Sequence, residues 1–400
     1  MATQAIRRVR PASQSRRAPQ LDYPLLIVVG ALVAIGLMMV YSTTFDWGYQ
    51  QYGDPAYFVV RQVLWLALGV AVMIGMLRVD YTLWHRFSIP LMGVALALLI
   101  GVLLFGQEVL GAQRSFFNGS IQPSELVKLM VVIYIADWLS SKGEKIRDLG
   151  YGLIPFAVLI GVIAGLIVIQ PDFGTAIVIV LVAGMMFFLA GADVKQIVIG
   201  LAVSSGTFLI LLLNSPHAQA RIQSFLDALN DPTQASYHVQ QALIAIGSGG
   251  LFGVGPGASR QKFGYLPVPH TDSVFAVLGE ELGLIGGLVV LALFAFLAYR
   301  GFRIALRAPD VFGTLIAAGI TCWIVLEALI NIAVISGMLP LTGLPLPFIS
   351  YGGSSLVSLL AAVGLLQSIA RGTRKGLTRS ALVDRGRRNG RPRLSRVGGR

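Results

Sequence analysis

The segment YLPVPHTDSVFAVLGEELG, residues 265–283, places a histidine and an aspartate at the start of an apolar run long enough to enter a membrane. Asp272 lies at the boundary of that run, and Glu280 and Glu281 follow two turns further in. Acidic side chains are costly at membrane depth unless a cavity or a partner holds them. The segment therefore predicts a membrane helix that begins at a chemical site, with Asp272 as the candidate general base.

The composition places most of the chain in a lipid bilayer. Of its 400 residues, 55% are hydrophobic and 12% are charged, and the mean hydropathy is +0.75. These values exclude a water-soluble globular protein. The net charge of +12 resides in the two tails, because residues 1–20 hold five Arg and residues 371–400 hold eleven Lys or Arg. Such tails favour anionic lipid or a partner protein, so no nucleic acid is expected as a ligand.

Apolar runs of about 20 residues predict an all-α polytopic membrane protein with about ten transmembrane helices. Residues 21–370 form this membrane domain, between a basic arm at 1–20 and a basic tail at 371–400. The single cysteine, Cys322, lies inside an apolar run and is expected to pack as a small hydrophobe. The predicted helices cover roughly 23–43, 57–77, 87–105, a run that begins after Pro123, 152–169, 174–190, 196–213, 272–299, 311–335 and 351–370.

Ten helices place both termini on one side of the membrane. Alternating the loops between the two sides puts both basic tails and most other Lys and Arg on that same side. Positively charged loops are retained in the cytoplasm, so both termini are predicted to be cytoplasmic. The loops 106–123, 214–271 and 336–350 then face outward, and they carry the unusual polar motifs of the chain.

Several charged side chains lie beside the predicted outer loops. Glu125 and Lys128 are one helical turn apart, which fits either a self-neutralising ion pair or a substrate contact. Arg61 lies about a turn inside an outer helix end, where it either snorkels to the interface or meets substrate. Arg114 has no nearby partner in the sequence and suits contact with an anionic group.

The large outer loop, residues 214–271, combines three patterns. Residues 237–246 have the apolar spacing of a short amphipathic helix on the surface. The glycine-rich stretch 247–257 lacks the Gly-Lys-Ser/Thr signature and a preceding strand, so close backbone approach to a ligand or a neighbouring helix fits better than a nucleotide site. Arg260 and Lys262 then supply donors and positive charge ahead of His270.

The segment GMLPLTGLPLPFISYGGSSL, residues 337–356, contains three prolines and paired glycines that break helical structure. Irregular backbone at membrane depth is tolerated only where it is buried or lines a cavity. The segment is therefore predicted to form a cavity wall. In the preceding helix, Glu327 and Asn331 are four residues apart and are expected to hydrogen-bond to each other.

Four motifs follow one another in the chain: QPSELVKL at 122–129, QPDFGTA at 170–176, YLPVPHTDSVFAVLGEELG at 265–283 and PLPFISYGGSSL at 345–356. In this order they resemble the SEDS family of shape, elongation, division and sporulation proteins. The resemblance spans about residues 20–370, and the family's essential aspartate falls on Asp272. It implies the SEDS fold and a peptidoglycan glycosyltransferase that polymerises lipid II on the outer face of the bacterial cytoplasmic membrane. The implied partners are a class B penicillin-binding protein and other division or elongation proteins.

The chain departs from the family pattern at three positions. Ser115 follows the first outer arginine where tryptophan is usual, Ser273 follows the aspartate where phenylalanine is usual, and His238 stands where the loop helix usually has glutamine. GEELG and FLD at 225–227 favour the division branch, whereas DYPLLI at 22–27 also suits the elongation branch.

The reaction implied by the family is a transfer of the undecaprenyl-linked glycan to the 4-hydroxyl of the acceptor N-acetylglucosamine, with inversion. An alcohol nucleophile needs a base, for which Asp272 is the candidate. The leaving pyrophosphate needs cationic side chains or a divalent metal. The chain shows no metal-ligand spacing, so Mg²⁺ or Mn²⁺ would be held mainly by substrate phosphates. Candidate substrate contacts are Arg61, Arg114, Glu125, Lys128, Arg260, Lys262, His270 and Ser354.

Two other classes of function remain open on the sequence. Outward acids and broken helices also suit a flippase for lipid-linked oligosaccharides, although the polar groups gather on one face and no internal repeat is visible. A division scaffold that recruits partners through its basic tails is a third possibility.

Overall fold

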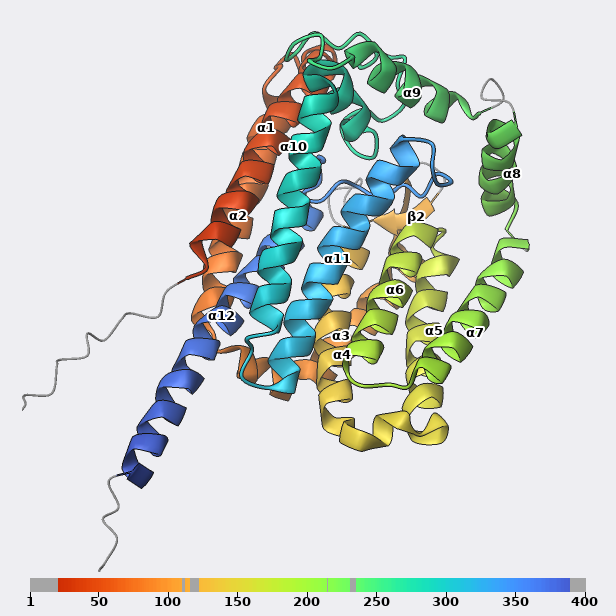
Figure 1. Ribbon diagram of the computed structural model, residues 1–400. Helices are drawn as coiled ribbons and strands as arrows, with labels where there is room; N and C mark the ends of the chain where they lie inside the picture. Colours follow the sequence, from red (N-terminus) through yellow and green to blue (C-terminus); the bar gives the residue numbers. More distant parts are fainter. Residues whose placement is uncertain (1–20, 110–111, 116–121, 214, 231–234, 389–400) are drawn as a thin grey trace, which may run out of the picture.

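The computed structural model describes residues 21–109, 112–115, 122–213, 215–230 and 235–388. In this part the chain forms an elongated bundle of α-helices with one small hairpin of two strands (Figure 1). The helices are α1 (Tyr23–Tyr52), α2 (Tyr57–Arg78), α3 (Trp84–Phe105), α4 (Pro123–Lys142), α5 (Ile154–Ile169), α6 (Phe173–Leu189), α7 (Val194–Leu213), α8 (Pro216–Asn230), α9 (Tyr237–Gly249), α10 (Val274–Ala305), α11 (Val311–Ile335) and α12 (Gly353–Arg388). The strands β1 (Gln107–Val109) and β2 (Ala112–Ser115) are antiparallel, and short turns of 3-10 or π-helix cover Tyr81–Leu83, Gly143–Arg147 and Leu149–Leu153.

Each of the ten apolar runs is helical, so the chain is a multi-pass helical membrane protein. Helices suit this role because lipid offers no partners for backbone N–H and C=O groups. Within the described residues, seven helices are long and apolar enough to cross a membrane, and α6 and α7 are shorter apolar helices. Helix α4 carries Glu125, Lys128 and Asp137 within its span. The number of crossings stays a prediction.

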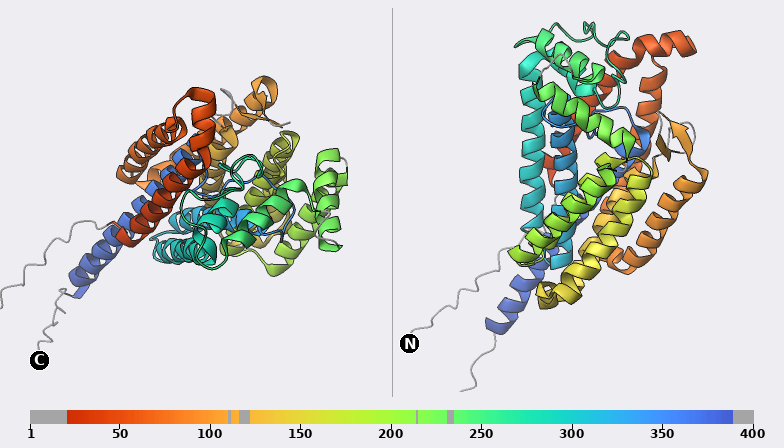
Figure 2. Two further views of the ribbon diagram at one scale, coloured as in Figure 1. Left: turned by 90° about the horizontal axis from the view of Figure 1, so that it is seen from above. Right: turned by 90° about the vertical axis from the view of Figure 1, so that its right-hand side faces the viewer.

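The two ends of the bundle differ in character. Helix α1 begins and α12 projects at one end, which we call the terminal end (Figure 1). Helix α9 and residues 250–273 lie at the opposite end, which we call the loop end (Figure 2). The described residues of the predicted outer loops 214–271 and 336–350 meet there, because the Ser350 hydroxyl donates to the Thr271 carbonyl and Arg221 contacts the Leu341 carbonyl.

Polar contacts fasten the terminal end. Asp22 accepts a hydrogen bond from the Leu25 amide as the cap of α1, and its carboxylate lies 2.5 Å from Arg300 Nη2 of α10. The Asp22 amide also donates to Gln367 Oε1 of α12 at 2.8 Å. Carboxylates at helix starts satisfy orphan amides and favour the positive end of the helix dipole. Three helices distant in sequence are thereby joined at their ends.

Helix α10 is broken at Gly283, where the predicted run 272–299 gave no sign of an interruption. Gly283 has φ 67° and ψ −168°, a conformation that glycine adopts far more readily than other residues. The break frees backbone groups of α10, and the glycine-rich stretch after α9 binds them. The four hydrogen bonds are Val254 N–H to Glu280 O (3.0 Å), Gly255 N–H to Glu281 O (3.1 Å), Leu284 N–H to Gly250 O (2.9 Å) and Ile285 N–H to Leu251 O (3.2 Å).

This interlock explains the glycines of residues 247–257. A Cβ at Gly249 would overlap the backbone of Gly279, and one at Gly253 would overlap the backbone of Glu281. The stretch therefore makes the predicted close approach, and its partner is a neighbouring helix. Buried backbone groups must be paired, and here the loop and the helix break satisfy one another.

Other boundaries differ from the sequence-based expectations. Helix α1 continues past the predicted residue 43 to Tyr52, and it ends where Gly53 takes a left-handed conformation with φ 69°. Helix α12 continues past residue 370 to Arg388. The first outer loop contains the β1–β2 hairpin, and α8 was not expected inside the large loop. In each case, backbone hydrogen bonding of a helix or strand continues into sequence that no longer shows the apolar pattern.

The interlock predicts unequal effects of two alanine substitutions. Gly253→Ala should lower the thermal unfolding midpoint in detergent clearly more than Gly257→Ala, because Gly257 also has a positive φ of 79° but opens onto free space. The control should cost only the conformational penalty, roughly 1 kcal/mol. Equal midpoints for the two variants would contradict close packing at Gly253.

Candidate active site

Asp272 lies in the irregular chain just before α10 and is half-buried. Its carbonyl oxygen accepts a hydrogen bond from Asn331 Nδ2 of α11 at 2.9 Å. The residue lines a cavity of about 90 Å³ at the loop end. The other lining residues come from α8, α9, α11 and the chain that follows α11: Arg221, His238, Asn331, Val334, Ile335, Leu341, Thr342, Gly343 and Leu344.

The wall of this cavity includes part of the proline-rich segment, as predicted, through residues 341–344. Further along the same segment, Ser350 donates to the Thr271 carbonyl at 2.6 Å, and the Tyr351 amide donates to the His270 carbonyl at 2.8 Å. The irregular backbone therefore holds the residues immediately before Asp272. The carbonyls of Thr271 and His270 are thereby paired within the protein, as burial requires.

His238 of α9 contacts the residue that follows Asp272. Its Nε2 lies 2.5 Å from Ser273 Oγ, and Ser273 donates its own proton to the Pro267 carbonyl at 3.1 Å. Nε2 must then carry a proton, since a hydroxyl has only one to donate. Burial, together with the positive charge of Arg221, lowers the pKa of His238 below its usual value. A neutral imidazole therefore stands beside Asp272 at neutral pH.

His270 lies among aromatic rings. Its ring centroid is 4.9 Å from that of Trp47, and it also neighbours Phe58 and Tyr351. Burial lowers the pKa of His270 to about 4, so its side chain is neutral at pH 7. A neutral ring among aromatic side chains favours a role in packing the chain before Asp272 over a role in binding phosphate.

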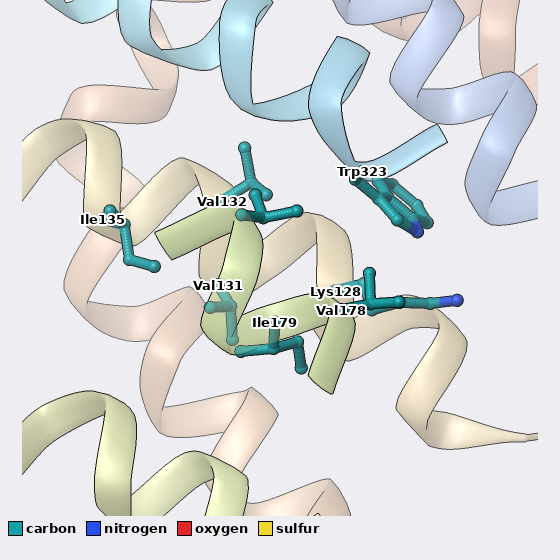
Figure 3. A pocket seen from close by; sticks show the side chains of 8 residues that line it. Lys128, Val131, Val132, Ile135, Val178, Ile179 and Trp323 are labelled. Atoms are coloured by element: carbon teal, nitrogen blue, oxygen red, sulfur yellow. The ribbon is translucent and has the colours of Figure 1, made fainter. Parts of the chain in front are cut away.

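Lys128 forms a buried cluster with two carboxylates. Its Nζ lies 2.9 Å from Glu125 Oε1 and 2.8 Å from Glu327 Oε1 of α11. Trp323 donates from Nε1 to the second oxygen of Glu327 at 2.6 Å. Figure 3 shows the Lys128 ammonium pointing away from the aliphatic side chains of an adjoining cavity of only about 10 Å³. That volume admits at most one water molecule.

This arrangement corrects the expected pairing of Glu327 with Asn331. Glu327 binds Lys128 and Trp323, whereas Asn331 donates to the carbonyls of Asp272 and Leu344. Spacing on one helix suggested a local pair, but both residues find partners on other elements. Their roles therefore differ: one completes an ionic cluster, and the other holds the chain around the cavity.

Lys262 is also committed to a buried network. Its Nζ lies 2.9 Å from Glu281 Oε1, 2.9 Å from Ser42 Oγ and 2.7 Å from the Gly257 carbonyl. Each side chain of the Lys262–Glu281 pair is at most 2% exposed. The network ties the large loop to α1 and α10, which favours a structural role over substrate binding.

The neighbouring carboxylate, Glu280, holds the same loop. It accepts hydrogen bonds from Ser259 Oγ at 2.5 Å and from the Arg260 amide at 2.9 Å. The Arg260 side chain itself is exposed at the loop end. Glu280 and Glu281, the two acids predicted inside the helix, thus both fasten the loop.

The remaining candidates occupy separate places. Arg61 of α2 is partly buried, and its guanidinium lies 5.8 Å from the ring centre of Tyr57. Ser354, at the start of α12, accepts a hydrogen bond from the Gln122 amide just before α4 at 3.1 Å. Arg114 belongs to β2, and its side chain lies outside the described part of the structure.

A metal site of protein ligands is not formed by the described residues, in which no three His, Cys, Asp or Glu side chains converge suitably. Any Mg²⁺ or Mn²⁺ would depend on phosphate oxygens of the substrate. Cys322 is buried in α11 as a free thiol, which agrees with its expected packing role.

The sequence matches the cell cycle protein family FtsW/RodA/SpoVE over residues 23–375. The chain belongs to this family. It is 42% identical to stage V sporulation protein E of Bacillus subtilis (strain 168), over 88% of this chain and 98% of that protein. It is 39% identical to a probable peptidoglycan glycosyltransferase FtsW of Trichlorobacter lovleyi, over 89% of this chain and 94% of the relative. The SEDS resemblance is thereby confirmed.

Solved structures of this family share the fold. The chain resembles Thermus thermophilus RodA with a TM-score of 0.65 and 30% identity, over 88% of this chain and 97% of RodA. It also resembles a chain in a peptidoglycan synthase complex, studied for its coordination of polymerization and crosslinking, with a TM-score of 0.73 and 28% identity over 88% and 98% of the two chains.

Several residues of the candidate site were not predicted in these positions from the sequence. Arg221 and Thr342 line the Asp272 cavity, and Glu327 completes the Lys128 cluster. Two of the three departures from the family pattern, His238 and Ser273, contact each other. A signal for this contact was present in the sequence, because two unusual residues both lay near the predicted site.

The Lys128 cluster predicts an order of stability. Lys128→Met should lower the unfolding midpoint in detergent more than Glu125→Gln does, because the first leaves two buried carboxylates without their cation whereas the second leaves Lys128 paired with Glu327. Unpairing a buried charge typically costs about 3–5 kcal/mol. The reverse order would show that Glu327 does not hold Lys128.

Proposed function

We propose that this protein polymerises the glycan strands of peptidoglycan, with Asp272 as the general base. The proposal is supported by the cavity at the loop end, where a half-buried carboxylate meets polar groups from three other elements. Relatives of similar length are named peptidoglycan glycosyltransferases. The donor would be a glycan on undecaprenyl pyrophosphate, and the acceptor would be lipid II.

The proposed step is a single displacement at the donor's anomeric carbon. Asp272 takes the proton of the acceptor 4-hydroxyl as its oxygen forms the new bond, and the bond to the pyrophosphate oxygen breaks with inversion. The carboxylate needs no covalent intermediate in such a reaction. His238 is neutral and hydrogen-bonded to Ser273. It therefore does not neutralise the negative charge of Asp272, as an imidazolium would.

The pyrophosphate leaving group requires positive charge nearby. Lys128 and Lys262 are buried against carboxylates, whereas Arg221 and Arg260 are exposed at the loop end. We therefore propose that arginines of this end, with Arg61 and Arg114 as further candidates, stabilise the pyrophosphate. Arginine suits this role because its planar fork binds phosphate oxygens in pairs.

We also propose how the protein lies in the membrane. Both termini would lie in the cytoplasm and the Asp272 cavity would face outward from the bacterial cytoplasmic membrane, where lipid II is polymerised. A crosslinking partner, proposed to be a class B penicillin-binding protein, is supported by the similarity to a chain of a peptidoglycan synthase complex. Several relatives named FtsW favour a role in cell division over elongation.

Replacing Asp272 tests the proposed base. Asp272→Asn should reduce lipid II polymerisation by roughly 10² or more, since the amide cannot accept the proton. The matched control is Asp54→Asn at the same end, because Asp54 is exposed and caps the Ala56 amide, as asparagine also can. Activity of Asp272→Asn within tenfold of the wild type would remove the assignment, and lipid II transport without polymer would favour a flippase.

Orientation is tested by labelling single cysteines in intact cells, with Cys322 replaced by Ala. An impermeant maleimide added outside should modify cysteine at Gln219, which is exposed on α8 at the loop end. It should not modify cysteine at Ser141, which is exposed near the end of α4. The opposite pattern would reverse the proposed topology.

A further inference from the structure

Two polar atoms on the wall of the Asp272 cavity lack hydrogen-bond partners within the described part of the protein. They are Asn331 Oδ1 and Thr342 Oγ1, and both are buried. Asn331 as a whole is only 2% exposed. Buried polar atoms without a partner are uncommon and costly, so these two call for a bound group that supplies hydrogen bonds.

The orientation of the Asn331 amide follows from its neighbours. Nδ2 lies 2.9 Å from the Asp272 carbonyl oxygen and 2.6 Å from the Leu344 carbonyl oxygen. Carbonyl oxygens only accept, so the NH₂ end must face them and Oδ1 must be the atom left over. Oδ1 can only accept a hydrogen bond. Thr342 can accept one or donate one.

The charges on this wall select the kind of ligand. Asp272 and Asn331 Oδ1 both present acceptor oxygens, which repel phosphate and attract groups that carry hydrogen. The neutral His238 adds no charge, whereas Arg221, which also lines the cavity, contacts the Leu341 carbonyl at 3.4 Å. The oxygens next to Asp272 therefore fit the hydroxyl groups of a neutral sugar better than phosphate oxygens.

We propose that Asn331 Oδ1 and Thr342 Oγ1 bind the hydroxyls next to the attacking one, at C3 and C6 of the acceptor sugar. This inference rests on the proposed function and makes the Asp272 cavity the acceptor subsite. Two hydrogen bonds beside the reacting hydroxyl would orient it toward the Asp272 carboxylate. Orientation of this kind supplies much of the rate enhancement when two substrates must meet.

Thr342→Val provides a clean probe because valine keeps the shape and removes only the hydroxyl. The hydroxyl has no partner among the described residues, so the variant should keep the wild-type unfolding midpoint. Thr342→Ser restores the hydroxyl. The matched control is Thr314→Val on α11 near the terminal end, where Thr314 Oγ1 donates to the Asp310 carbonyl at 2.9 Å.

The experiment combines these variants with altered acceptors. Coupling of a radiolabelled donor, lipid II deoxygenated at the glucosamine C4, to lipid II or to its 3-deoxy and 6-deoxy analogues is measured with purified full-length protein and its transpeptidase. The wild type should lose about tenfold or more with at least one analogue, as expected for a buried hydroxyl contact. With natural lipid II, Thr342→Val should lower coupling by a similar factor. With that same analogue, Thr342→Val should couple almost as well as the wild type does, because the contact is already missing. Thr342→Ser and Thr314→Val should behave as the wild type.

Four results would overturn the inference. Thr342→Val could lower coupling by the same factor with every acceptor, or leave it unchanged, and either result would take Thr342 out of contact with the sugar. If the wild type forms polymer and couples the donor to both deoxy analogues as well as to lipid II, neither sugar hydroxyl is bound, and the whole proposed subsite is wrong. If the wild type with its partner forms no polymer at all, the proposed function fails, and the inference fails with it.

Discussion

Two adjacent buried carboxylates on α10, Glu280 and Glu281, hold the loop that leads to Asp272. A buried carboxylate must be paired, because removing it from water otherwise costs several kcal/mol. Glu281 is paired with Lys262 and Ser42, and Glu280 accepts from Ser259 and from the backbone. The backbone interlock at Gly283 adds four hydrogen bonds to the same region. The position of Asp272 depends on this region.

The charges at the loop end therefore fall into two sets. One set is buried and satisfied inside the protein, in the Lys262 network and in the Lys128 cluster. The other set borders a cavity or solvent and includes Asp272, Arg221 and Arg260. The first set gives the membrane-embedded framework its geometry. The second set is available to a substrate that carries both a reactive hydroxyl and a pyrophosphate.

The sequence predicted well what depends on local pattern. Each of the ten predicted apolar runs is helical in the structure, and the unusual placement of Asp272 at a helix start marked the candidate base. Contacts between distant segments were not accessible in this way. Glu327 meets Lys128 across 199 residues of sequence, and spacing alone suggested Asn331 as its partner. The break in α10 was hidden because glycine also occurs within membrane helices, and only the backbone of residues 250–255 shows why Gly283 is needed.

Lys262 and Arg260 show the same limit. Both were candidates because cations beside the catalytic motif suit a pyrophosphate, yet one is buried against Glu281 and the other has an exposed side chain. Two residues apart in a loop, they differ because the loop is folded against α1 and α10. Which cation stays accessible is thus a property of tertiary packing.

The most direct test of the distinction between buried structural charges and accessible charges uses two variants, Lys262→Met and the double variant Lys262→Met, Glu281→Gln. Their unfolding midpoints and their lipid II polymerisation are compared. The single variant should lose both stability and activity, because Glu281 is left charged and buried. The double variant should recover much of both, because the lone charge is gone and Lys262 is not a substrate contact. A double variant that regains stability but stays inactive would place Lys262 among the substrate-binding cations and contradict the account.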